Sequence, residues 1–270
     1  MTFNMPQHKR LVGLARLILL CTFLTIWELL GQLNQSALFF ISCPSQVFPA
    51  FMGLVLRQNL FSHFMTTAAE AFVGSTLGTF VGTAIGLTLW YSSFVATVLH
   101  PFILVAGSIP LITLAPLFIV WFGIGFQMKV ALAFFSTVFL ALAQSYRGAL
   151  EANACYSEVL CAMRASKTSI FKRAILPGSL NWVFQSMRLN IGLGLLGAFL
   201  GEFIASQSGL GYLILRAASL YDMPNAISAA TGIAILAIIF DRIATLIESN
   251  SIRITEVLTV PKIIWKRNNR

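Results

Sequence analysis

Charged residues are scarce in this sequence. Only 10% of the 270 residues are Asp, Glu, Lys or Arg, whereas 57% are hydrophobic and the mean hydropathy is +0.83. A soluble globular domain carries roughly 25% charged residues, so this chain lacks the side chains that keep a surface hydrated. A cytosolic enzyme, a disordered regulator and a nucleic-acid-binding module are therefore excluded. Because a membrane-spanning helix needs about 20 mainly apolar residues, the length fits about six spans.

Cysteine and histidine are also few. The four cysteines form no Cys-x-x-Cys pair and show no metal-ligand spacing, and His8, His63 and His100 lie far apart in the sequence. We therefore expect no disulfide, no metal site, no cofactor and no catalytic cluster that would make the chain an enzyme. The sequence also has no Gly-x-x-x-x-Gly-Lys-[Ser/Thr] phosphate loop, so we do not expect it to bind ATP in that way.

The apolar residues gather in segments long enough to cross a membrane. The sequence predicts an all-α, polytopic membrane protein, with spans near 12–33, 66–89, 98–121, 129–149, 183–205 and 226–248. Between the first two spans, the stretch 47–60 is interrupted and short, and we expect it to be an interfacial helix. We divide the chain into an N-terminal helix with its outer loop (1–60), a core (61–250) and a basic tail (251–270).

The basic residues give the chain a net charge of +9 and a pI near 9.8. They gather in the segments 1–16, 147–173 and 253–270. Because loops rich in Lys and Arg stay on the cytoplasmic side of a membrane, we expect both termini and the 150–182 loop on that side. The loops at 34–65, 122–128 and 206–225 then face outward. This distribution explains the charge without a nucleic-acid partner.

Two parts of the core carry residues suited to a solute path or its gate. Pro101, Pro110 and Pro116 interrupt the third span, and Pro110 and Pro116 are the candidates for the path, because broken backbone at membrane depth is tolerated where protein or water covers it. A kinked packing helix explains these prolines equally well. Glu202 lies near the end of the fifth span, before Gly209 and Gly211. It either caps or pairs near that turn, or faces the path.

Glycine recurs every four residues in the second span, at Gly74, Gly78, Gly82 and Gly86. On an α-helix these positions share one face, which lets a neighbouring backbone approach closely. The pattern favours tight helix packing, and the alternative is that this face borders a path that opens and closes.

The longest loop expected on the cytoplasmic side, 151–177, is predicted to form two short helices joined by a bend. Ser169 is a candidate N-cap for the second helix, and we expect Pro177 to end that helix. Glu158, followed 19 residues later by the end of Ile175-Leu176-Pro177, resembles the EAA loop of ATP-binding-cassette importer permeases.

Two further segments resemble the nitrate, sulfonate and taurine branch of that family. One is Leu-Ala-Pro-Leu-Phe-Ile-Val-Trp-Phe-Gly-Ile-Gly at 114–125, and the other is Gly201-Glu202 followed by Ser-Gly-Leu-Gly-Tyr at 208–212. The resemblance covers about residues 60–250. It implies a type I importer permease fold in the cell (inner) membrane, moving a small solute such as nitrate, a sulfonate, taurine or a thiamine precursor.

The resemblance also implies the partners. They would be a second permease copy in a homodimer, a cytoplasmic ATP-binding subunit, an extracytoplasmic solute-binding protein and the lipid bilayer. The loop residues that would couple to the ATPase are Glu158, Arg164, Ala165, Ser166, Phe171, Ile175, Leu176 and Pro177. An ion-driven secondary carrier is the alternative, and it predicts paired midplane charges and an internal repeat, which we do not find clearly in the sequence.

Arg164 departs from the family pattern, which has a near-invariant glycine six residues after the loop glutamate. Glycine adopts positive φ angles at little cost, whereas arginine does not. We therefore expect either a different bend in this loop or a different fit to the ATPase.

Overall fold

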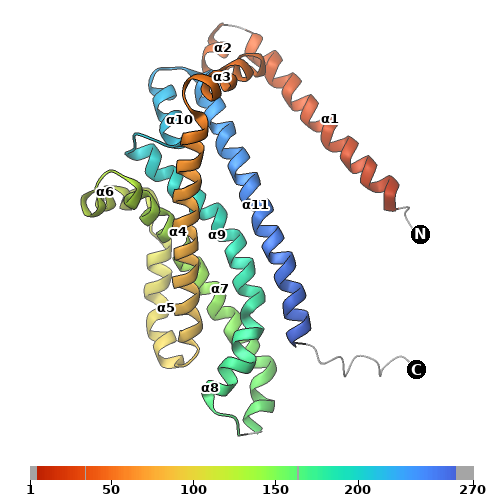
Figure 1. Ribbon diagram of the computed structural model, residues 1–270, viewed down its shortest axis with the longest axis vertical. Helices are drawn as coiled ribbons and strands as arrows, with labels where there is room; N and C mark the ends of the chain where they lie inside the picture. Colours follow the sequence, from red (N-terminus) through yellow and green to blue (C-terminus); the bar gives the residue numbers. More distant parts are fainter. Residues whose placement is uncertain (1–4, 34, 163, 260–270) are drawn as a thin grey trace. The chain divides into compact units, whose positions relative to one another are not determined.

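The computed structural model describes residues 5–33, 35–162 and 164–259, and the side chains of 11–33, 38–154 and 164–248. These residues are helical, with no strand among them. The helices are α1 (Met5–Gln32), α2 (Gln35–Ile41), α3 (Pro44–Arg57), α4 (Leu60–Leu89), α5 (Ser93–Ser108), α6 (Leu111–Phe122), α7 (Phe126–Ala162), α8 (Lys167–Ile170), α9 (Leu176–Ile204), α10 (Leu210–Ser219) and α11 (Met223–Thr259) (Figure 1). A π-helical turn, Phe171–Ile175, joins α8 to α9.

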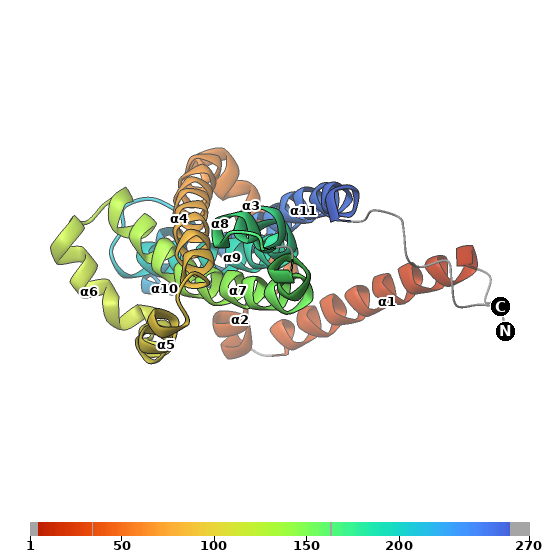
Figure 2. The same ribbon diagram turned by 90° about the horizontal axis from the view of Figure 1, so that it is seen from below.

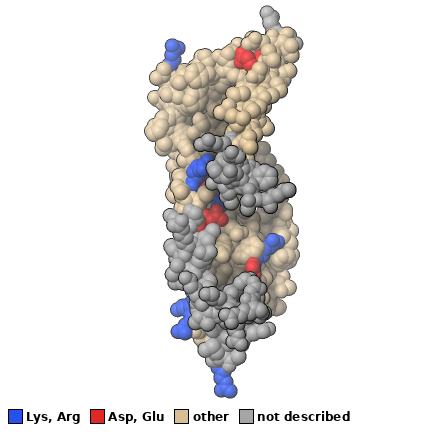
Figure 3. Space-filling view, turned by 90° about the vertical axis from the view of Figure 1, so that its right-hand side faces the viewer, with Lys and Arg blue, Asp and Glu red and all other residues tan. Residues whose placement is uncertain are grey.

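Six segments of the described chain are long and apolar enough to cross a membrane, which confirms the prediction of an all-α polytopic protein. They are Leu11–Gln32, Leu38–Arg57, Leu60–Leu89, Phe126–Ala154, Lys167–Ile204 and Met223–Glu248. Charged side chains are correspondingly sparse on the face drawn in Figure 3. The segment Leu38–Arg57 was expected to hold only an interfacial helix. It is longer than expected, but a turn at Ser42, where φ is 57°, divides it into α2 and α3.

The third predicted span, 98–121, is not one helix. It is divided into α5 and α6, whose axes differ by 90°. Ile109 and Pro110 have extended backbone at this bend, with ψ angles of 124° and 122°. A proline disfavours helical angles in the residue before it, which explains why the helix ends here. Pro101 and Pro116 stay inside α5 and α6, so only one of the three prolines breaks the span.

The chain divides into two compact units, one of residues 1–61 with 213–232 and the other of residues 62–212 with 233–270. In the first unit, Glu28 of α1 holds the start of α3. Its carboxylate accepts hydrogen bonds from the Ser45 amide (3.1 Å) and hydroxyl (2.8 Å). A carboxylate at a helix N-terminus is stabilising because it pairs with otherwise unbonded amide groups.

The core of the second unit is formed by α4, α7 and α9, which lie side by side (Figure 1, Figure 2). The glycine stripe of α4 faces α7. A Cβ atom built on Gly74 or Gly78 would lie 2.7 or 2.6 Å from the carbonyl oxygens of Val130 and Phe134. In α9, a Cβ atom on Gly197 would lie 2.7 Å from Ala133 Cα. The prediction that these glycines allow close helix packing is confirmed.

Candidate functional site

Three charged side chains from three helices meet inside the second unit. Glu70 of α4 and Glu202 of α9 are 0% exposed, and Lys129 of α7 is 3% exposed. Lys129 forms an ion pair with Glu70, and Glu202 lies close enough to both for its charge to interact with theirs. Buried charges are tolerated only when they are paired and hydrogen-bonded. This group, which we call the Glu70 cluster, therefore ties α4, α7 and α9 together.

Glu202 also holds the turn between α9 and α10. Its Oε2 accepts a hydrogen bond from the Gly211 amide (2.7 Å), and its Oε1 lies 2.6 Å from the hydroxyl of Thr67. The Thr67 oxygen in turn accepts a hydrogen bond from the Leu210 amide (2.9 Å). These contacts support the interpretation that Glu202 caps the turn rather than facing a path.

The two glycines of this turn are required by its geometry. Gly209 has a φ of 111°, and a Cβ atom there would overlap the Glu202 carboxylate. A Cβ atom on Gly211 would lie 2.9 Å from the Phe199 carbonyl oxygen. The turn thus brings together three of the candidates from the sequence, Glu202, Gly209 and Gly211.

The rest of the turn is fixed by side chains from α4 and α7. His63 Nδ1 accepts a hydrogen bond from the Gly209 amide (2.9 Å), and Lys129 Nζ donates one to the Ser206 hydroxyl (3.1 Å). The Ser206 hydroxyl oxygen also accepts one from the Ser208 amide (3.1 Å). Lys129 therefore serves both the Glu70 cluster and the turn.

Sequence reasoning selected Glu202 as a site residue, but it selected neither Lys129 nor Glu70. The available signal was that Lys129 lies at the edge of an apolar segment, outside all three basic segments. Such a lysine needs a carboxylate partner when it is buried.

The other two candidates, Pro110 and Pro116, lie apart in the sequence from that turn, at the α5–α6 bend and inside α6. The buried side chains of α6 are Ala115 and Phe118, and they pack against Met128 and Leu132 of α7. Pro110 thus lies at the bend of the α5–α6 pair and Pro116 within α6, and their role at a solute path stays a prediction.

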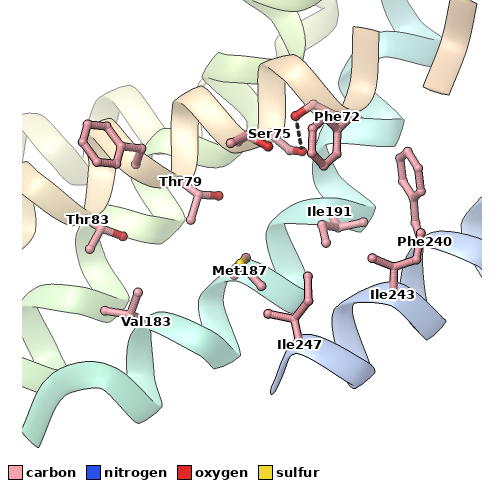
Figure 4. Close-up of a pocket in the computed structure, with 12 residues that line it drawn as sticks. Phe72, Ser75, Thr79, Thr83, Val183, Met187, Ile191, Phe240, Ile243 and Ile247 are labelled. Atoms are coloured by element: carbon pink, nitrogen blue, oxygen red, sulfur yellow. Dashed lines mark hydrogen bonds between the residues drawn. The ribbon is translucent and has the colours of Figure 1, made fainter. Parts of the chain in front are cut away.

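A groove of about 380 Å³ lies between α4, α9 and α11 within the second unit (Figure 4). The α4 side carries the hydroxyl groups of Ser75, Thr79 and Thr83, and the α9 and α11 sides are apolar, with Met187 and Ile243 among them. The Thr79 hydroxyl accepts a hydrogen bond from the buried amide of Asn190 (2.9 Å). The groove is thus mainly apolar, with hydroxyl groups on one side.

Among the described side chains, no three His, Cys, Asp or Glu residues lie close enough to hold a metal ion.

The segment 164–177, which we call the loop segment, packs against α4 and α7. Ile170 and Ile175 are buried with Leu87, and the partly buried Ala165 lies against the same cluster. Phe171 contacts two aromatic rings of the α4–α5 turn, with centroids 5.8 Å from Trp90 and 4.9 Å from Tyr91. Lys167 Nζ donates a hydrogen bond to the Tyr91 carbonyl oxygen (2.8 Å). Arg164, Ser166 and Leu176 are exposed, so the segment has one packed side and one open side.

Two details of this segment differ from the prediction. The N-cap of α8 is Ser166, whose hydroxyl accepts a hydrogen bond from the Ser169 amide (3.3 Å), and not Ser169. Pro177 does not end a helix, because it occupies the first turn of α9 and the chain stays helical from Lys167 through the π-helical turn. Proline is tolerated in a first turn because its missing N–H is not needed there. Glu158 belongs to α7, but its side chain lies outside the described residues.

Arg164 has a φ of 54°, in the left-handed region. Arg164 therefore adopts the positive φ angle that glycine adopts at little cost, and the expected difference in bend or in fit to the ATPase stays a prediction. We expect Arg164→Gly to raise the free energy of unfolding by about 1 kcal/mol, because glycine adopts this conformation without the strain that a side chain brings. Thermal unfolding of the purified protein in detergent measures the change. The matched control is Lys172→Gly, which places glycine in helical backbone of the same segment and is expected to destabilise.

Comparison with known proteins agrees with this arrangement. Residues 74–252 match the family described as binding-protein-dependent transport system inner membrane component. The formylaminopyrimidine transport permease protein ThiX of Halalkalibacterium halodurans is 28% identical over 203 residues, covering 75% of this chain and 80% of that protein. The putative aliphatic sulfonates transport permease protein SsuC of Bacillus subtilis is 27% identical, covering 87% of this chain and 84% of that protein. The taurine transport system permease protein TauC of Escherichia coli is 27% identical, covering 82% and 81%.

The fold also matches a solved structure. A chain of the MetNI methionine ABC transporter, in an inward-facing conformation, aligns with a TM-score of 0.63 and 18% identity, covering 74% of this chain and 96% of that chain. At 18% identity this match shows the fold alone, which is the fold of type I importer permeases.

Proposed function

The chain belongs to the family of binding-protein-dependent transport inner-membrane components, the permeases of ATP-binding-cassette importers, and we propose that two copies of it form the solute path of such an importer. The family consists of multi-pass membrane transport proteins and is not an enzyme family, and it does not favour the alternative of an ion-driven secondary carrier. A cytoplasmic ATP-binding subunit would supply the energy, and an extracytoplasmic protein would deliver the solute. We further propose residues 61–250 as the permease core.

The loop segment is the observation that carries this proposal. It is a helical element held by Phe171 and Lys167 against the α4–α5 turn, with its open side free for a partner. Such an element transmits motion to α7 and α9, with which it is continuous or in contact. The sequence has no Gly-x-x-x-x-Gly-Lys-[Ser/Thr] phosphate loop, and we propose that a separate ATPase binds the open side of the loop segment. We also propose that both termini and the loop segment lie on the cytoplasmic side, which the basic segments 1–16, 147–173 and 253–270 support.

The names of the relatives indicate a broad substrate class. The named relatives transport a formylaminopyrimidine, aliphatic sulfonates and taurine. All are small organic solutes with polar groups, and we propose a solute of that kind here.

Phe171→Ala tests the coupling role. We expect solute uptake and solute-stimulated ATPase activity to fall together, by about tenfold, because loss of the ring removes the aromatic contacts that hold the loop segment to Tyr91 and Trp90. The measurement uses vesicles reconstituted with the permease, its ATPase and the binding protein. Phe94→Ala, at a phenylalanine of α5 that is 76% exposed, is the matched control and should transport normally. Normal uptake by Phe171→Ala would remove the coupling role from this segment.

A further inference from the structure

An ion-pair cluster lies between α9 and α11, within two segments that are apolar enough to span a membrane. Arg188 Nη2 lies 3.1 Å from Asp241 Oδ1, and Arg188 Nη1 lies 3.4 Å from Glu248 Oε2. Arg188 belongs to the segment Lys167–Ile204, and both acidic residues belong to Met223–Glu248. At 1.5 Å per residue, Asp241 lies about 27 Å from the start of its segment at Met223, within the roughly 30 Å of a hydrocarbon core.

This cluster is open to its surroundings. The side chains of Arg188 and Asp241 are 43% and 57% exposed, unlike the fully buried Glu70 cluster. An ionised group at membrane depth is costly against acyl chains, and such groups face water or protein. Arginine can extend its long side chain toward the interface, but aspartate is too short to do so. The surface around Asp241 therefore requires water or protein in the assembled permease.

Two exposed positions of α9 on the side of Arg188 are also polar, although the exposed Leu189 and Leu196 border them. Asn181 and Gln185, seven and three residues before Arg188, are exposed, and a Cβ atom on the exposed Gly192, one turn after it, would meet nothing within 4 Å. These positions lie on one side of the helix because residues three, four and seven apart share a face. By contrast, the strongly exposed positions of α5 include Phe94, Phe102 and Val105, as a lipid-facing surface requires.

We infer that the face of α9 and α11 that carries Arg188 and Asp241, which we call the ion-pair face, lines the water-filled solute path. This inference rests on the proposed function, since it names the wall of the same path. Arg188 links α9 to α11 and neutralises part of the negative charge of Asp241 and Glu248 on the ion-pair face. Both of its bonds to Asp241 reach Oδ1 (3.2 Å from Nε and 3.1 Å from Nη2), so Oδ2 is presented to water or to an N–H or O–H group of the solute. Asp241 is thereby a specificity-determining residue for solutes with hydrogen-bond donors.

Cysteine labelling distinguishes a water-filled face from a lipid-facing one. A maleimide reacts with the thiolate, which forms in water and is suppressed in apolar surroundings. Gly192→Cys and Ala237→Cys place thiols one helical turn from Arg188 and Asp241, at exposed positions on the same sides of α9 and α11. Ile239→Cys is the matched control, because it is 41% exposed on the opposite side of α11 at nearly the same depth.

The measurement uses a charged, membrane-impermeant maleimide in opened membrane vesicles that contain the whole complex. Mass spectrometry of the labelled peptide identifies the site, so the four native cysteines can remain. We expect Gly192→Cys and Ala237→Cys to react about tenfold faster than Ile239→Cys, or more. The two positions lie on different helices, so one well-assembled variant is sufficient.

Two results would overturn the inference. Labelling no faster than that of Ile239→Cys would place the ion-pair face against lipid. Exclusion of the reagent together with formation of a disulfide-linked dimer on oxidation would place it against a second copy of the chain. Uptake and ATPase stimulation are measured in the same vesicles. A variant that transports but resists labelling refutes only this inference, whereas a native chain that neither transports nor stimulates an ATPase refutes the proposed function.

Discussion

Replacing Lys129 with methionine is expected to prevent the permease from accumulating as a folded protein. Methionine keeps the length of the side chain but removes the charge that pairs with Glu70. The Glu70 carboxylate, which is 0% exposed, would then be left beside Glu202 without a cation. Removing one partner of a buried pair typically costs about 3–5 kcal/mol. The α9–α10 turn also loses the hydrogen bond to Ser206.

The yield of monodisperse protein in detergent and its thermal unfolding measure this effect. The double variant Lys129→Met with Glu70→Gln removes both charges of the pair, so we expect it to recover a substantial part of the lost yield. Lys172→Met, at an exposed lysine of the π-helical turn, is the matched control and should accumulate normally. Normal yield and stability of Lys129→Met would show that the Glu70 cluster does not hold the three helices together.

The Glu70 cluster also shows why sequence reasoning found the helices but not their main polar contact. Each apolar segment is a local feature, so composition and length were sufficient to predict most of the spans. Glu70 and Lys129 come from different helices, and their meeting depends on the register in which α4 and α7 pack. The glycine stripe of α4 predicts close packing, but it does not say which residues of α7 lie opposite.

The loop segment was also predicted only in part, because part of its backbone geometry depends on contacts with another segment. Its packed residues Ile170, Phe171, Ala174 and Ile175 include two pairs that are four apart, so this apolar face could be found in the sequence. The π-helical turn could not, because it depends on how Phe171 fits against Trp90 and Tyr91 of another segment. That turn is what lets the chain pass through Pro177 without leaving helical geometry.

The bend between α5 and α6 was predicted, but its position was not. Three prolines in one apolar stretch predicted a disturbed helix, but the sequence did not say which proline would break it. Pro101 and Pro116 remain within helices, and the 90° bend occurs only at Pro110. The bend is stabilised by tertiary packing of Phe118 against Met128, which a local pattern does not reveal.

Gly82→Leu is expected to abolish assembly of the permease. A Cβ atom on Gly82 would fall 2.8 Å from Ala141 Cβ and closer still to the Val138 carbonyl oxygen, so even alanine does not fit there. A leucine adds three further carbon atoms against backbone that cannot rotate away. Overpacking of a core costs about 1–3 kcal/mol when side chains can adjust, and we expect a larger cost here because α7 itself must move.

The measurement is the amount of complex with the ATPase that is recovered from membranes, together with solute uptake. Gly13→Leu is the matched control, because Gly13 is an exposed glycine of α1 where a Cβ atom would meet nothing within 4 Å. It should assemble and transport like the wild-type chain. Since the four stripe glycines of α4 all face α7, Gly78→Leu should fail in the same way as Gly82→Leu. Assembly and uptake at wild-type levels in both stripe variants would show that α4 and α7 do not pack through this face in the membrane.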